Sequence, residues 1–167
     1  MKDDPLYELA LKVGVTLSNH RYSLATAESC TGGWIAKAVT DIPGSSGWFE
    51  RGFITYSNRS KSEQLDVAPA LILECGAVSA EVVEAMARGA LKYSPADVAV
   101  AVSGIAGPEG GNLEKPVGTV WFAWAIRADG QHRVHCEFGH FGGSRDKVRY
   151  AATERGLAGI LEILSRS

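Results

Sequence analysis

The segment from Asp97 to Ser103 constrains the fold more than any other part of the chain, because it is short and almost entirely apolar. A strand with one face in water alternates apolar and polar residues, and this segment does not alternate. It is therefore predicted to be a central strand that is buried on both faces. A sheet that contains such a strand needs helices on both of its sides.

The segments around this strand are predicted to provide those helices and the rest of the sheet. Alternating helices and strands of this kind indicate an α/β protein. Asp129-Gly130 joins the last two strands as a hairpin, so the predicted sheet is mixed, mostly parallel with an antiparallel hairpin. Apolar periodicity and turn signals predict helices over residues 4–19, 29–40, 60–67, 79–93 and 144–164, a helical turn at 71–74, and further strands over 22–27, 52–57, 117–127 and 131–138.

The composition of the chain excludes several classes of protein. Its 167 residues, 46% of them apolar, suit a single globular domain over residues 1–167. The net charge of −2 gives no general attraction to nucleic acid or to anionic membranes. No apolar run approaches the ~18 residues of a membrane span, and the first residues lack the layout of a signal peptide. We therefore predict neither a nucleic-acid partner nor a membrane association.

The cysteines indicate the redox compartment. Cys30, Cys75 and Cys136 are odd in number, widely spaced and without a C-x-x-C motif. This pattern is typical of reduced thiols rather than of a disulfide framework. The sequence therefore predicts a cytoplasmic protein.

Three polar or glycine-rich segments follow predicted strands. They are the turn at Ser29, the segment 56–61 and the loop that begins at Ser103. Ligands of open α/β sheets lie outside the carboxyl ends of the strands. If these strands are parallel, the three segments meet at one edge of the sheet and form a site.

Ser29 is the candidate nucleophile of this site. It lies at a strand-to-helix junction, where free N–H groups favour an anion, and Gly32 and Gly33 allow a ligand close to the backbone. On the local pattern alone, Ser29 could equally be an ordinary N-cap. Cys30 is a second candidate nucleophile, although no histidine is evidently placed to activate it; an inert buried thiol is the alternative.

A serine nucleophile needs a base, and Lys61 is the best candidate. Ser60 and Glu63 match a capping box, which would place Lys61 in the first turn of a helix. There the helix dipole and partial burial both disfavour the charged ammonium, and Tyr56 could orient the amine or relay its proton. A solvated surface lysine is the alternative. The histidines support a Ser-His-Asp arrangement only weakly.

The loop after Ser103 and a later arginine are candidates for binding an anion. Gly104 and Gly107 would let backbone N–H groups converge on a phosphate or a carbonyl oxygen. The loop has neither Walker A nor dinucleotide-binding spacing, so a plain wide turn is the alternative. Arg145 lies at a predicted helix start and could clamp a phosphate or carboxylate, or could be an exposed arginine.

Six separate blocks of residues run in order through nearly the whole chain. They are Thr26-Ala-Glu-Ser-Cys-Thr-Gly-Gly33, Pro43-Gly-Ser-Ser46, Thr55-Tyr-Ser-Asn58 with Lys61, Gly76-Ala-Val-Ser79, Ser103-Gly-Ile-Ala-Gly-Pro108 and Lys115-Pro-Val-Gly-Thr-Val120. Together they resemble the CinA C-terminal domain family, whose stand-alone members are the nicotinamide-nucleotide amidohydrolases called PncC. The resemblance implies a three-layer α/β/α sandwich. It also implies hydrolysis of nicotinamide mononucleotide to nicotinate mononucleotide and ammonia, in pyridine nucleotide salvage to NAD.

The resemblance implies a Ser/Lys dyad that uses no metal and no cofactor. Ser29 matches the serine of the dyad and Lys61 its lysine, while Ser46 stays open as a residue that shares or takes the main role. The acidic residue that the family carries before its arginine is replaced here by Ser144, so this chain lacks that carboxylate. We expect backbone N–H groups near Cys30 to stabilise an oxyanion. The expected substrate-binding residues are Thr31, Gly32, Gly33, Ser103, Gly104, Gly107 and Arg145.

Two functions of other classes stay open. One is a catalytically silent nucleotide-binding or regulatory module, because members of the family are linked with competence and DNA-damage responses. The other is a structural partner that assembles as a homo-oligomer. Trp48, Trp121 and Trp124 could form its interface, although core packing explains these side chains equally well.

Overall fold

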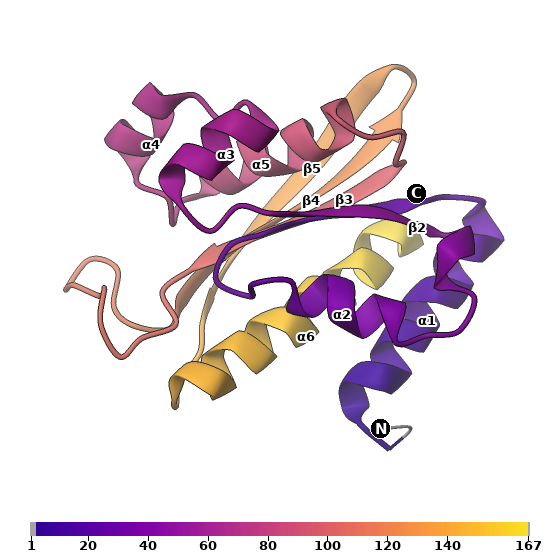
Figure 1. The fold of residues 1–167 in the computed structure, drawn as a ribbon, viewed down its shortest axis with the longest axis horizontal. Helices are drawn as coiled ribbons and strands as arrows, with labels where there is room; N and C mark the ends of the chain where they lie inside the picture. The colour runs from indigo at the N-terminus through magenta and orange to yellow at the C-terminus, as the bar shows by residue number, and fades with distance from the viewer. Residues whose placement is uncertain (1–2, 167) are drawn as a thin grey trace.

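The computed structural model describes residues 3–166, which form one five-stranded sheet with helices on both faces (Figure 1). The strands are β1 (Leu24–Glu28), β2 (Phe49–Ile54), β3 (Val98–Gly104), β4 (Thr119–Ala128) and β5 (Gln131–His140). The helices are α1 (Pro5–His20), α2 (Trp34–Thr40), α3 (Asn58–Leu65), α4 (Pro69–Cys75), α5 (Ala80–Lys92) and α6 (Arg145–Ser165), with a 3₁₀ helix η1 (Ser45–Gly47).

The sheet has the strand order β2-β1-β3-β4-β5. β1 pairs in parallel with both β2 and β3, whereas β4 is antiparallel to β3 and β5 is antiparallel to β4. All strands except β4 therefore point in the same direction. The predicted mixed sheet with an antiparallel hairpin is confirmed.

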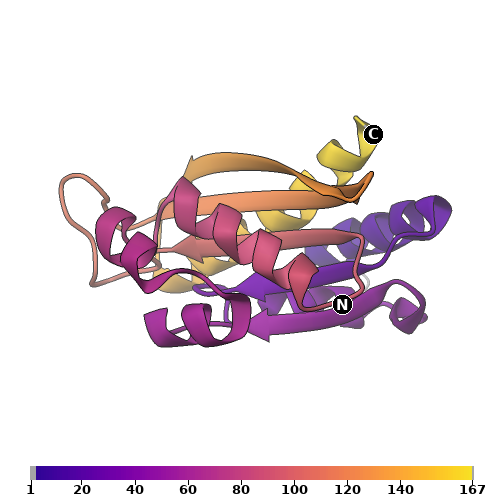
Figure 2. The same cartoon turned by 90° about the horizontal axis from the view of Figure 1, so that it is seen from above.

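The helices form two layers. α1, α2 and α6 cover one face of the sheet, and α3, α4 and α5 cover the other (Figure 1). Seen from above, α5 lies along the middle of the sheet, with α3 and α4 near the ends of the parallel strands (Figure 2). The three-layer α/β/α sandwich is confirmed.

The central strand β3 shows why its sequence is so apolar. Val98, Val100 and Val102 pack against the α1, α2 and α6 layer, while Ala99 and Ala101 face α5. All five side chains are fully buried. Because alanine carries only a methyl group, α5 can lie close to this face of the sheet. The predicted burial of this strand on both faces is confirmed.

The tryptophans contribute mainly to the core. Trp48 and Trp124 are buried, and the Trp124 indole N–H donates to Gly156 O of α6 at 2.9 Å. Trp121 is half-buried against Phe138 of β5. Core packing therefore accounts for two of the three tryptophans considered for an oligomer interface.

Two element boundaries differ from the sequence prediction at the site. β2 ends at Ile54 rather than at residue 57, and α2 begins at Trp34 rather than near Ser29. Gly32 and Gly33 have positive φ angles of 59° and 99°. This left-handed backbone delays the helix and leaves a turn over residues 29–33.

The predicted capping box at Ser60 is also wrong. α3 begins at Asn58, and the Ser57 side chain caps it by accepting a hydrogen bond from Ser60 N at 3.0 Å. Lys61 is therefore the fourth residue of α3, at the end of its first turn rather than at its start. The effect of a helix dipole falls off within the first turn, so it is weaker at this position than at the predicted one.

Neither a disulfide nor a membrane-spanning helix occurs in the described part of the chain. Cys30, Cys75 and Cys136 are all free thiols. No helix within residues 3–166 is long and apolar enough to cross a bilayer.

Candidate active site

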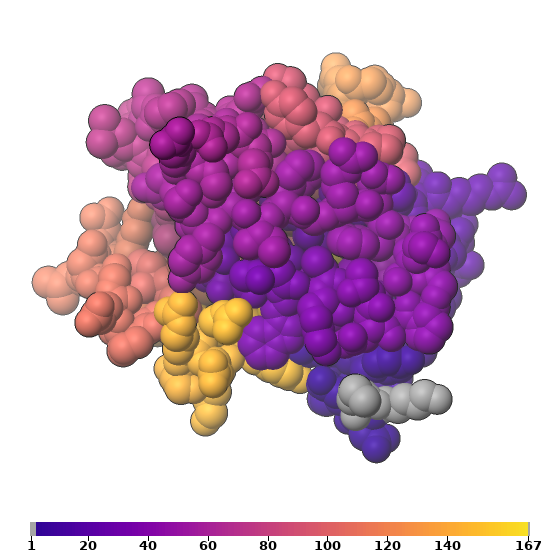
Figure 3. Space-filling model, in the orientation of Figure 1, coloured from indigo at the N-terminus to yellow at the C-terminus, as the bar shows by residue number. Residues whose placement is uncertain are grey.

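The carboxyl ends of β1, β2 and β3 lie level at one edge of the sheet, because Glu28 is in register with both Ile54 and Val102. The segments that follow these strands line a pocket of about 260 Å³, together with the start of α6. In the space-filling view, the loop after β3, the start of α6 and the α3 segment meet at the left side of the molecule (Figure 3). The three segments therefore meet at one edge of the sheet, as predicted.

Ser29 and Lys61 are in direct contact inside this pocket. Lys61 Nζ lies 3.0 Å from Ser29 Oγ and also donates to Thr55 O at 2.7 Å and to Tyr56 O at 3.4 Å. Ser29 is 7% exposed and Lys61 only 1% exposed. The alternative of a solvated surface lysine is therefore excluded.

Burial changes the proton affinity of this lysine. Within residues 3–166 no carboxylate forms an ion pair with it, and desolvation lowers the pKa of Lys61 from 10.5 to about 8, with a small opposing effect from Cys30. A lysine with this pKa is partly neutral near physiological pH and can accept a proton. The predicted direction of the shift is confirmed, and burial, one of its two predicted causes, is the main one.

Cys30 has the opposite character. Its side chain is 5% exposed, and burial raises the pKa of the thiol to about 12. A nucleophilic cysteine has to reach the thiolate form, which burial here suppresses. The inert-thiol alternative agrees with this environment.

The turn after β1 is held by hydrogen bonds from several sides. Ser29 N donates to Val102 O at 3.0 Å, and Gly32 N donates back to Ser29 O at 3.0 Å. The fully buried carboxylate of Glu28 accepts from Thr31 Oγ1 at 2.7 Å. It also accepts from the N–H groups of Ile35 and Ala36 at 2.9 and 3.0 Å.

These bonds correct two sequence predictions. The start of α2 does not bind an exogenous anion, because the Glu28 carboxylate already occupies its free N–H groups. Ser29 is not an N-cap either, since Gly33 holds that position. Among the backbone groups expected to stabilise an oxyanion, the Gly32 N–H is used within the turn, that of Cys30 faces only its own thiol sulfur, and that of Thr31 has no acceptor within residues 3–166.

Arg145 joins two walls of the pocket. Its guanidinium donates to Gly107 O at 2.7 Å and to Tyr56 OH at 3.0 Å. In the described part of the chain, the N–H groups of Ala106, Gly107, Glu109, Gly110 and Gly111 have no acceptor. This loop and Arg145 thus present hydrogen-bond donors of the kind that bind a phosphate.

The structure brings together seven of the eleven predicted site residues. The pocket is lined by Ser29, Tyr56, Lys61, Ser103, Gly104, Gly107 and Arg145. Thr31, Gly32 and Gly33 lie outside it, and the Thr31 hydroxyl turns to Glu28 instead. Ser46 is exposed in η1, which precedes β2 and so lies at the opposite end of the sheet.

The prediction missed other lining residues. Asn58, Ala77, Val78 and Glu109 line the pocket without having been assigned a role. Asn58 and the pair Ala77-Val78 belong to two of the sequence blocks described above, so membership of these blocks could have indicated them as site residues. No sequence pattern indicated Glu109, because its position depends on the path of a loop.

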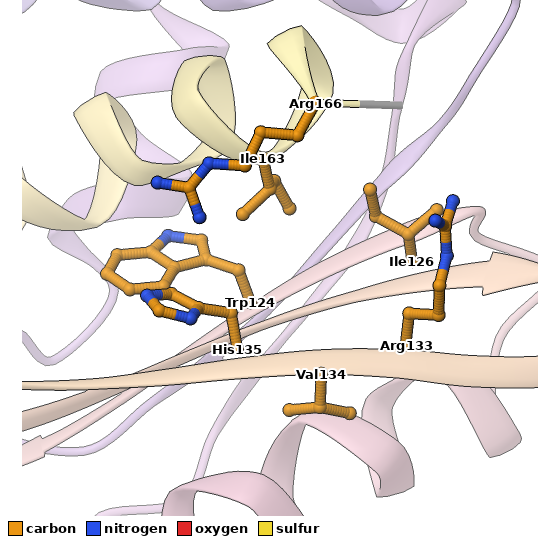
Figure 4. Close-up of a pocket in the computed structure, with 7 residues that line it drawn as sticks. All are labelled: Trp124, Ile126, Arg133, Val134, His135, Ile163 and Arg166. Carbon is orange, nitrogen blue, oxygen red and sulfur yellow. The ribbon is translucent and has the colours of Figure 1, made fainter.

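A smaller hollow of about 130 Å³ lies toward the opposite end of β4 (Figure 4). There His135 stacks on Trp124 at 6.0 Å between ring centres, and Ile163 of α6 and Arg166, directly after this helix, lie above them. This hollow contains no serine, cysteine or lysine among its lining residues. Within residues 3–166, no group of three or more histidine, cysteine or acidic side chains is placed to hold a metal ion.

Comparison with known proteins identifies the family. The sequence model of the CinA C-terminal domain matches residues 6–164. The chain belongs to this family. The resemblance of the six sequence blocks is thereby confirmed.

Relatives that carry an enzymatic name are similar along almost their whole length. The nicotinamide-nucleotide amidohydrolase PncC of Escherichia coli K12 is 53% identical over 158 residues, which are 94% of this chain and 93% of that protein. The protein of the same name from Pseudomonas putida is 52% identical and covers 96% of this chain and 98% of its own length.

Solved structures agree with the fold. A CinA superfamily protein from Klebsiella pneumoniae superposes with a TM-score of 0.92 at 35% identity, over 98% of this chain and all of that one. A competence/damage-inducible protein from Agrobacterium tumefaciens has a TM-score of 0.88 at 41% identity, over 96% of this chain and 95% of its own.

Proposed function

We propose that this protein is an amidohydrolase that converts nicotinamide mononucleotide to nicotinate mononucleotide and ammonia. The buried contact of 3.0 Å between Ser29 Oγ and Lys61 Nζ carries this proposal. The names of the relatives, at 52 to 53% identity, supply the substrate. A serine nucleophile needs a base in contact with it, and lysine can be that base in a pocket that no histidine within residues 3–166 lines.

The first half of the reaction acylates Ser29. Neutral Lys61 accepts the hydroxyl proton across the same 3.0 Å contact, and Ser29 Oγ attacks the carboxamide carbon. The N–H groups of Cys30 and Thr31 stabilise the resulting oxyanion, at about 3 kcal/mol for a well-placed donor. Protonated Lys61 then gives its proton to the leaving nitrogen, and ammonia departs.

The second half releases the acid. Water gives a proton to Lys61 and attacks the acyl carbon, and the tetrahedral intermediate collapses to nicotinate mononucleotide while Ser29 Oγ regains its proton. The donors at Arg145 and in the loop of residues 106–111 hold the 5′-phosphate during both halves. Tyr56 holds Arg145 in place through its hydroxyl.

The proposed product places the enzyme in pyridine nucleotide salvage, since nicotinate mononucleotide is used in NAD synthesis. We place this reaction in the cytoplasm, which agrees with the three free thiols at Cys30, Cys75 and Cys136.

Ammonia release from nicotinamide mononucleotide tests the proposed function directly. We expect the purified protein to release one ammonia for each nicotinate mononucleotide formed, in the presence of EDTA to remove any contribution of a contaminating metal. Nicotinamide riboside, which lacks the phosphate, is expected to be a much poorer substrate. Binding of the mononucleotide to folded protein without ammonia release would contradict the proposal and would favour the binding-module alternative.

The pH dependence of kcat/KM should report the ionisation of Lys61. The amine acts as a base only when it is neutral, and its pKa is about 8. We therefore expect kcat/KM to rise with pH, to be roughly a tenth of its maximum at about pH 7, and to level off above about pH 9. The profile is measured under conditions where the protein stays folded. A profile that falls over this range would mean that Lys61 acts in its charged form.

A further inference from the structure

We infer that Arg149 is a positioning residue for the proposed amidase reaction, acting through the backbone of the turn that carries the nucleophile. Arg149 is not among the residues that line the pocket. Its guanidinium reaches from α6 to the other side of the turn, where Nε donates to Cys30 O at 3.0 Å and Nη2 donates to Thr31 O at 3.2 Å. This inference rests on the proposed function and deepens it.

The bond to Cys30 O fixes the direction of a peptide group. In a trans peptide the C=O and the next N–H point in opposite directions. Holding Cys30 O toward Arg149 therefore directs the Thr31 N–H away from Arg149. That N–H has no acceptor within residues 3–166, so it is available to donate to the oxyanion of the tetrahedral intermediate that forms on Ser29 Oγ. Arg149 thereby orients a proposed oxyanion donor without touching the substrate.

The surroundings of Arg149 fit this role better than a role in charge pairing. No carboxylate in the described part of the chain forms an ion pair with its guanidinium. The guanidinium lies 5.4 Å from the ring centre of Trp34, which holds the side chain in place. A Cβ at residue 32 would lie 3.3 Å from Arg149 Nη2, so glycine at this position leaves room for the guanidinium.

Arginine is suited to this position because its planar fork can donate to two neighbouring carbonyls at once. A lysine ammonium has the same charge but only a single nitrogen to donate from. Arg149→Lys should therefore keep the charge and lose the paired geometry. Arg145, by contrast, lines the pocket and is proposed to hold the phosphate, so its replacement should act mainly on substrate binding.

The test compares Arg149→Lys and Arg149→Ala with wild type, with Arg145→Lys and with the surface control Arg88→Lys. We expect both Arg149 variants to lower kcat by roughly 10²-fold, with KM within about threefold of wild type, since one misplaced oxyanion donor has an effect of this size. The pH at which activity levels off should not move, because Lys61 is untouched. Arg145→Lys should instead raise KM. Free guanidinium at low concentration should partly restore Arg149→Ala and leave Arg145→Lys unchanged.

A second readout separates this inference from the proposed function. A fluorophosphonate probe reacts with an activated serine, forming an Oγ–P bond and releasing fluoride, and its phosphoryl oxygen occupies the oxyanion position. We expect wild type to be labelled at Ser29 and the Arg149 variants to be labelled much more slowly, with thermal unfolding confirming that they are folded. Labelling of the variants at the wild-type rate would overturn the role of Arg149 alone. Failure of wild type to be labelled and to release ammonia would overturn both proposals.

Discussion

Ser29→Ala is expected to lower ammonia release from nicotinamide mononucleotide by at least about 10³-fold while the protein stays folded. The substitution removes the proposed nucleophilic oxygen, which lies 3.0 Å from Lys61 Nζ. The fold should tolerate the change, because Ser29 N still donates to Val102 O, and within residues 3–166 the side chain makes no hydrogen bond other than the one to Lys61. The loss should therefore be in kcat rather than in the amount of folded protein.

Two other serines serve as controls for this experiment. Ser46 is exposed at the opposite end of the sheet, so Ser46→Ala should keep the wild-type rate. Ser103 lines the pocket and is 1% exposed, but no base in the described part of the chain forms a hydrogen bond with its hydroxyl, so Ser103→Ala should stay active with at most a changed KM. Kinetics of the three variants, with thermal unfolding of each, decide the assignment. An active Ser29→Ala with an inactive Ser46→Ala or Ser103→Ala would assign the nucleophile to that other serine.

The fold could be predicted from the sequence because the central strand allows few alternatives. Residues 98–102 are buried on both faces, and the valines and alanines alternate in the sequence as they do in the structure. Asp129-Gly130 likewise occupies the hairpin turn, with positive φ at both residues. Such features depend on local chemistry, and they are visible in a single sequence.

The site was less predictable because its details depend on tertiary contacts. The pairing of Ser29 with Lys61 and the lowering of the lysine pKa by burial were expected, but the predicted position of Lys61 at the start of a helix was wrong, since the start of α3 is set by Ser57. The hydrogen bonds that the Glu28 carboxylate accepts from the start of α2 were not expected, because the local sequence does not show which N–H groups a buried carboxylate will contact. Arg149 lies about 120 positions from the carbonyls that it binds, so no local pattern could connect them.

Replacement of the proposed base should separate catalysis from stability. Lys61→Met keeps an unbranched apolar side chain one atom shorter and removes the amine, so we expect kcat/KM to fall by roughly 10³-fold and its dependence on pH between about 7 and 9 to disappear. Ser29 stays in place in this variant, but its hydroxyl then has no base. A variant that keeps more than about a tenth of the activity, or the same pH profile, would assign the base to another group.

The burial of Lys61, which makes it a better base, should also make the folded protein less stable at neutral pH. Burial lowers the pKa of Lys61 from 10.5 to about 8 in the folded protein, so at neutral pH the unfolded chain holds this proton more tightly than the folded one does. The folded state is therefore penalised below about pH 8, by an amount on the order of 3 kcal/mol at 1.4 kcal/mol per pH unit. The penalty declines as pH rises from about 8 to about 10.5, and the free energy of unfolding should increase over this range.

Comparison of wild type with Lys61→Met isolates this effect, since all other titrating groups are common to both proteins. Lys61→Met loses the bond from Nζ to Thr55 O, and leaving that buried carbonyl without a donor costs about 1–3 kcal/mol. Removal of the buried cation offsets this cost at neutral pH, so the melting temperatures of the two proteins should be similar at about pH 7. At about pH 10 the wild type should be the more stable. Urea unfolding at both pH values measures the difference, and equal pH dependence in the two proteins would mean that Lys61 has an ordinary pKa in the folded state.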